Sequence, residues 1–181
     1  MFNIFSKHDK RINVPEQIYG IVVARARDPQ LFIECELPDT VMGRFEVLAL
    51  HVFLLSRRMK QEGGETAISL SQEVFDQFVA DVERALREIG IGDTSVPKRK
   101  KKMIRSFYGQ IDDFDAHLDG KDRKSLVEKV NARFFEGDNA EMAKRFATYI
   151  FTMADGLANI PFVEFKSGKF DWPAINIPES A

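Results

Sequence analysis

The strongest chemical signal in the sequence is a run of cationic side chains. Six of the eight residues from 98 to 105 are Lys or Arg, and none of the eight is acidic. The run falls in the first turns of a predicted helix, where the helix macrodipole favours anions over cations. Each misplaced charge lowers helix stability by about a few tenths of a kcal/mol. Helix stability therefore does not explain the run, which favours a site for a polyanion or an acidic partner.

Three kinds of partner suit such a run: an RNA backbone, anionic lipid headgroups, or an acidic protein surface. Tyr108 follows the run closely and has a ring that is able to stack on a base. Two structural alternatives stay open as well. Acidic residues elsewhere in the chain pair with the cations, or the run is an ordinary solvated helix face.

Further candidates lie on the most apolar predicted helix, residues 41–61. His51 is surrounded there by apolar residues. It is either a hydrogen-bonded core histidine or a residue that shapes a cleft for a partner. Long arginines near helix ends usually extend to water, which is our expectation for the arginines of this helix. The predicted partner-binding residues are Arg44, His51, Arg57, Arg58, Lys98, Arg99, Lys101, Lys102, Arg105 and Tyr108.

The sequence shows no specific arrangement of catalytic or metal-binding residues. It contains no G-x-S-x-G, P-loop, H-E-x-x-H or C-x-x-C motif, and its three histidines lie far apart in sequence. A lone cysteine such as Cys35 is usually a small buried hydrophobe. We therefore expect no catalytic residue, no cofactor and no metal. An enzyme that uses Cys35 or His51 is the alternative.

Composition limits the class of protein. The chain has 181 residues, of which 44% are hydrophobic and 30% charged, with a net charge of −2. These values favour one folded domain and exclude a polymer that coats nucleic acid over its whole surface. A single cysteine excludes an internal disulfide framework. The longest apolar stretch, residues 47–55, is too short to span a membrane, and residues 1–11 do not have the order of a secretory signal.

Helical spacing dominates the chain, and we predict an all-α domain of about six or seven helices. Residues 41–61 are apolar on nearly all sides, which places that helix at the centre of the fold. Ser69 and Gln72 have the spacing of a capping box, so a helix is expected to begin there. The predicted helical segments are 14–26, 28–33, 41–61, 69–89, 97–119, 125–135 and 139–157.

Residues 160–181 have no helical period but contain three prolines and several large apolar residues. We expect residues 1–159 to form the helical domain and residues 160–181 to form an extended arm that packs on it. A short hairpin that turns at Ser167 and Gly168 is the alternative. Most of the 16 Phe residues fall on helical stripes, which leaves the aromatic residues of the arm available to a partner.

Three segments, taken together and in this order, resemble one family. They are LPDT at 37–40 with GRFE at 43–46, HVFL at 51–54 with RR at 57–58, and LREIGIGD at 86–93 followed by Lys98, KKM at 101–103 and FYG at 107–109. Their order and spacing resemble the ubiquinol–cytochrome c reductase chaperone family, the cytochrome b assembly factors of the bc1 complex. The resemblance covers residues 18–157.

The resemblance implies a non-enzymatic assembly factor that binds newly made cytochrome b and supports assembly of the bc1 complex. Mitochondrial members work with a small partner subunit near the ribosomal exit tunnel. The chain is without their presequence-bearing extension, so we expect a bacterial relative in the cytoplasm or peripheral at the inner membrane. Its need for the small subunit stays open. The alternative is a ribosome- or RNA-binding module that uses residues 98–105.

Overall fold

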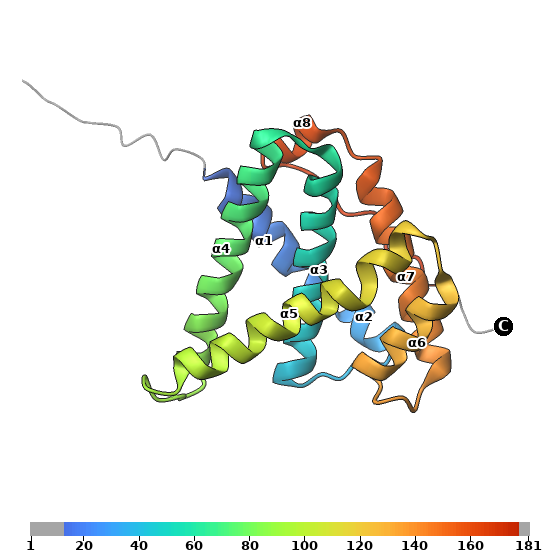
Figure 1. Cartoon of the computed structure of the whole chain (residues 1–181), viewed down its shortest axis with the longest axis horizontal. Helices are drawn as coiled ribbons and strands as arrows, with labels where there is room; N and C mark the ends of the chain where they lie inside the picture. Colours follow the sequence, from blue (N-terminus) through green and yellow to red (C-terminus); the bar gives the residue numbers. More distant parts are fainter. Residues whose placement is uncertain (1–12, 178–181) are drawn as a thin grey trace, which may run out of the picture.

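The structure is a computed structural model that describes residues 13–177 as an all-α fold (Figure 1). Within these residues the chain forms eight helices and no strand, one helix more than the seven segments that the sequence predicts. The helices are α1 (Val14–Ala26), α2 (Pro29–Glu34), α3 (Val41–Glu62), α4 (Gly64–Glu88), α5 (Val96–Asp119), α6 (Arg123–Phe134), α7 (Ala140–Ala158) and α8 (Phe162–Lys166).

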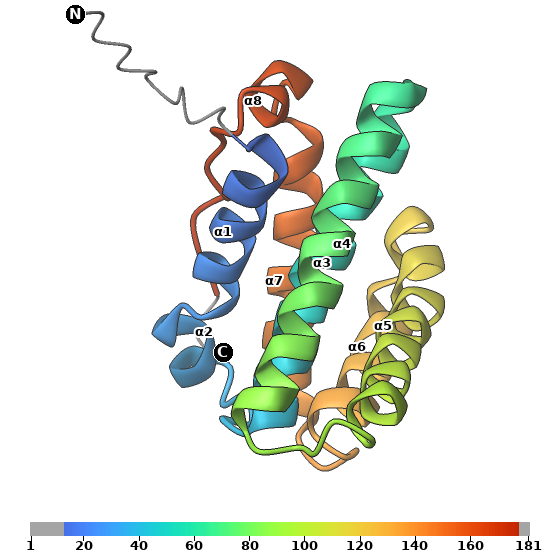
Figure 2. The ribbon, with the colours of Figure 1, turned by 90° about the vertical axis from the view of Figure 1, so that its left-hand side faces the viewer.

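Helix α3 is the centre of the fold, as its apolar sequence predicts. Every residue from Ala49 to Leu55 is buried, which covers all sides of the helix. The helices α1, α4, α5 and α7 all pack against it, and Figure 2 shows α1 and α5 on either side of α4. Thr40 caps the start of α3 through its side-chain oxygen, which accepts from the backbone N–H of Gly43 at 3.0 Å.

The start of α4 differs from the prediction. Gly63 ends α3 with a φ of 72°, a conformation that favours glycine, and α4 begins at the next residue. Ser69 therefore lies inside the helix, where its hydroxyl donates to the Glu73 carboxylate at 3.0 Å. The predicted capping box is wrong because the glycine pair reverses the chain sharply enough for α4 to start at once.

The C-terminal segment docks on the helices. Its first part forms the short helix α8, which the sequence analysis missed, and residues 168–177 have no regular structure. Phe170 and Trp172 are buried. Arg25 of α1 donates to the carbonyl oxygens of Trp172 and Pro173 at 3.4 and 2.9 Å. No hairpin forms within residues 160–177, since that stretch contains no strand.

Within residues 13–177, no helix is both long enough and apolar enough to cross a membrane. The prediction about a secretory signal concerns residues 1–11, which lie outside the described residues. The last four residues of the predicted arm, 178–181, also lie outside them.

Candidate binding surface

Helix α5 positions the basic run. Val96, Phe107 and Phe114 on one side of the helix are buried in the core. This side fixes the orientation of α5, so the cations of the first turns face outward. Lys100 is the exception, because its ammonium group forms an ion pair with Glu83 of α4 at 2.5 Å. Five cations of the run are exposed and have no ion-pair partner among the described residues: Lys98, Arg99, Lys101, Lys102 and Arg105.

Four of these cations form one continuous face. At 3.6 residues per turn, Lys98, Lys101, Lys102 and Arg105 fall within about 100° of the helix circumference. We call these four residues the basic face of α5. The two pairs spaced four residues apart, Lys98 with Lys102 and Lys101 with Arg105, are neighbours of like charge and repel each other. The fold therefore gathers the positive charge on one strip.

An apolar groove lies next to this face, between α3, α4 and α5. It has a volume of about 350 Å³. Tyr108 is 53% exposed and Ile68 of α4 is 62% exposed, so two large side chains of the groove face solvent. The ring of Tyr108 packs on Phe75, with ring centroids 6.1 Å apart. The groove is lined by Ser56, Lys60, Ile68, Ser71, Gln72, Phe75, Phe107, Tyr108 and Ile111.

Arg44 lies at a second, smaller hollow of about 250 Å³ between α1, α3, α4 and α5. Its side chain is exposed and forms an ion pair with Asp39 at 2.5 Å. Its guanidinium carbon lies 5.6 Å from the centre of the Phe32 ring. Of the three arginines predicted on α3, Arg44 alone remains accessible to a partner.

Arg57 and Arg58 do not extend to water, and that expectation is wrong. The Arg57 side chain is 9% exposed and forms ion pairs with Asp115 and Asp119 at the acidic end of α5. Arg58 donates to the carbonyl oxygens of Leu157 and Ile160, each at 3.0 Å. Both arginines are held inside because acidic groups and helix-end carbonyls reach them there. We therefore leave them out of the candidate surface.

His51 is a core histidine, which confirms one of the two alternatives. It is fully buried. Its Nδ1 donates to the carbonyl oxygen of Val47 at 2.7 Å, and its Nε2 accepts from the hydroxyl of Tyr149 at 2.6 Å. Burial lowers the pKa of His51 to about 4, so the ring is neutral near pH 7. A partner cannot reach His51 in this structure.

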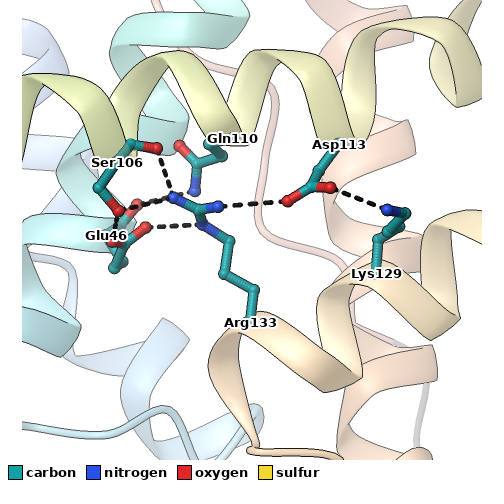
Figure 3. A network of polar contacts seen from close by, with 6 residues as sticks. All are labelled: Glu46, Ser106, Gln110, Asp113, Lys129 and Arg133. Carbon is teal, nitrogen blue, oxygen red and sulfur yellow. Dashed lines mark hydrogen bonds and ion pairs between the residues drawn. The ribbon is translucent and has the colours of Figure 1, made fainter.

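A polar network that no sequence motif signals is centred on Arg133 of α6 (Figure 3). The Arg133 guanidinium donates to the Glu46 carboxylate at 2.8 Å and to the backbone oxygen of Ser106 at 2.5 Å. It also forms an ion pair with Asp113 at 3.3 Å. This network joins α3, α5 and α6 through side chains of α5 that follow the basic face along the helix. Arg133 and Glu46 are separated by 87 residues, so no local pattern signals their contact.

The described residues offer little to catalysis. Cys35 is fully buried, and burial raises the pKa of its thiol to about 12, so the reactive thiolate does not form at neutral pH. Within residues 13–177, no three His, Cys, Asp or Glu side chains come together as a metal site would require. The candidate surface itself offers cations and an apolar groove, which are groups suited to recognition of a partner.

Comparison with known proteins agrees with the resemblance. Residues 34–172 match the sequence model of the family described as ubiquinol-cytochrome C chaperone. The crystal structure of the Cbp3 homolog from Brucella abortus superposes with a TM-score of 0.80 over 89% of each chain, at 34% identity.

Two vertebrate assembly factors are also similar to this chain. The chain is 30% identical over 107 residues to the ubiquinol-cytochrome-c reductase complex assembly factor 1 of Xenopus laevis, covering 59% of this chain and 53% of that protein. The corresponding mouse (Mus musculus) protein is 29% identical over 99 residues, covering 55% of this chain and 33% of that protein. The chain thus spans about half the length of one and a third of the other. Because the family match covers most of the described residues, this chain belongs to the ubiquinol–cytochrome c chaperone family.

Proposed function

We propose that this protein is a non-enzymatic assembly chaperone that binds newly made cytochrome b and supports assembly of the bc1 complex. The observation that carries this proposal is the family match over residues 34–172. That range includes every residue of the apolar groove and of the basic face of α5. We infer that the client binds the surface described above, which lies within that range.

The groove has the chemistry that such a client needs. A membrane protein that has not yet inserted exposes apolar segments, and exposed apolar surface promotes aggregation. Phe75, Phe107 and Ile111 give the groove an apolar floor, and Ile68 and Tyr108 form exposed contacts at its rim. We infer that the groove covers an apolar segment of cytochrome b until that segment inserts into the membrane or cytochrome b binds its cofactor.

A gene deletion with matched variants tests this proposal. Deletion should lower the amounts of cytochrome b and of assembled bc1 complex and leave unrelated proteins unchanged. The wild-type chain should restore both amounts. Ile68→Asp should not, because it places a charge at the rim of the groove. Ile33→Asp on α2 should restore both, because Ile33 is 75% exposed and lies outside the groove. Normal bc1 content in the deletion strain would overturn the proposal.

The ribosome- or RNA-binding alternative is supported by one specific observation, the exposed cations of residues 98–105. It predicts association with ribosomes that falls steeply with salt, since binding to phosphates releases counterions. The dependence on a small partner subunit also stays a proposal drawn from the family. Purification of the chain from native cells, followed by identification of small bound proteins, would test it.

A further inference from the structure

Helix α5 separates charge more sharply than the composition suggests. Residues 98–105 hold six cations and no acid, and the whole chain has a net charge of −2, so the rest of the chain carries −8. Two of the four acids of the later turns are partly buried and reach neighbouring helices. Asp113 pairs with Arg133 of α6, and Asp115 pairs with Arg57 of α3. The same helix thus holds Asp113 and Asp115 in ion pairs with neighbouring helices, leaves Asp112 exposed, and presents most of its cations to the outside.

The described residues leave the positive charge of the basic face of α5 uncompensated. None of its four cations has an ion-pair partner within residues 13–177. The neighbouring like charges repel, and cations near a helix N-terminus oppose the macrodipole. Lys100, which does pair, shows that α4 is able to supply a partner to this part of α5. An anion beyond the described residues would supply favourable electrostatic energy to this face.

Exposed apolar side chains lie on both sides of this face along the chain. Ile89, in the turn that precedes α5, is 56% exposed, and Tyr108, one turn after Arg105, is 53% exposed. Figure 1 shows the turn between α4 and α5 at an outer corner of the molecule, away from α7 and α8. Tyrosine is typical of the boundary between water and lipid, because its ring is apolar and its hydroxyl is polar.

We propose that the basic face of α5 binds the surface of an anionic membrane, with lipid phosphates on its cations and with Ile89 and Tyr108 at the headgroup level. The arrangement favours lipid over single-stranded RNA. RNA grooves use successive aromatic rings on which bases stack, whereas Tyr108 is the one exposed aromatic residue of α5 and its ring packs against Phe107. Four cations along one straight strip match a plane of phosphates. The proposal does not depend on which protein the groove binds.

Vesicle sedimentation with the full chain tests the proposal. The chain should bind vesicles of phosphatidylcholine mixed with phosphatidylglycerol, should not bind phosphatidylcholine alone, and should dissociate as salt rises. One cation near an anionic surface contributes about a fivefold change in affinity, so Lys101→Ala should weaken binding by about that factor. Failure of the wild-type chain to bind the anionic vesicles would overturn the proposal.

Two fourfold variants with the same change of net charge locate the site. Reversal of the basic face (K98E, K101E, K102E, R105E) should weaken vesicle binding by about a hundredfold or more. Reversal of four other exposed lysines (K124E, K144E, K166E, K169E) should weaken it far less. Circular dichroism checks that both variants are folded. Equal losses in the two variants would contradict the proposal, and so would tighter binding to a single-stranded RNA than to the vesicles at the same ionic strength.

Discussion

The two halves of α5 carry opposite charges, and the fold treats them differently. In the second half, Asp113 and Asp115 are partly buried and reach arginines of neighbouring helices. In the first half, the basic face has no ion-pair partner among the described residues. Paired buried charges hold helices in register, whereas unpaired exposed charges add little to stability. The acidic half therefore serves the fold, and the basic half is available for binding.

Substitution in the Arg133 network should lower the free energy of unfolding more than any other change proposed here. Arg133→Met should lower the free energy of unfolding by about 4 kcal/mol, because it leaves Glu46 and Asp113 without their shared partner. The Glu46 side chain is only 13% exposed, so water compensates poorly. Urea denaturation measures the change. The double variant Arg133→Met with Glu46→Met should recover part of the loss, and an equal or greater loss would contradict this role.

His51 extends the comparison to a buried group without charge. Its pKa is lowered to about 4 in the folded chain, against about 6.5 in the unfolded chain. The unfolded chain therefore binds the proton first as pH falls. The histidine should contribute full stability above about pH 6.5 and lose up to about 3 kcal/mol of it between pH 6.5 and pH 4.

The measurement for His51 is the free energy of unfolding at pH 7 and pH 4 in the wild-type chain and in His51→Gln. Acidic groups contribute to the pH dependence of both proteins, so the difference between the two slopes isolates the histidine. The slope should be smaller in His51→Gln. Equal slopes would show that His51 is not held neutral by the core.

Asp115→Asn should have a smaller effect, because Arg57 keeps Asp119 as a second partner. We expect a loss of about 1 to 2 kcal/mol in the free energy of unfolding, since the buried Arg57 side chain loses one charged contact. Thermal or urea denaturation measures it. Asp112→Asn provides the control, because Asp112 is exposed on the same helix and should change stability by less than about 0.5 kcal/mol.

Lys98→Glu should have the smallest effect, and the opposite sign. It places an acid near the N-terminus of α5 and removes a repulsion with Lys102, which together should raise the free energy of unfolding by about 0.3 to 0.5 kcal/mol. The same variant should weaken binding to anionic vesicles. A loss of stability above about 1 kcal/mol would show that Lys98 stabilises the fold. That result would contradict the claim that the basic half of α5 adds little to stability.

Periodicity predicted most of the helices, because the apolar residues of a buried helix face recur at short, regular spacing within the helix itself. The α5 stripe through Phe107, Phe114 and Leu118 is buried as predicted, and α3 is central. Errors arose where one backbone conformation decided the outcome. The positive φ of Gly63 allows α4 to begin earlier than predicted. Helix α8 has only five residues, too few for a helical period to be visible in the sequence.

The candidate surface was only partly predictable, because the partner of a charged residue lies far away in sequence. Exposure of the basic face follows from the core side of α5, so the sequence located it. Arg57, however, meets an acid 62 residues later, and no local pattern separates it from an arginine that extends to water. The apolar groove could not be predicted from the sequence, because Ile68, Phe75 and Tyr108 line one groove only when α4 packs against α5.

The most direct test of the central claim is capture of newly made cytochrome b. Cells are labelled briefly during bc1 synthesis, and the affinity-tagged full chain is purified from them as wild type, Ile68→Asp or Ile33→Asp. We predict that labelled cytochrome b co-purifies with the wild-type chain and with Ile33→Asp, and is lost with Ile68→Asp. Absence of cytochrome b from the wild-type sample, or equal capture by Ile68→Asp, would contradict a chaperone that holds this client in the groove between α3, α4 and α5.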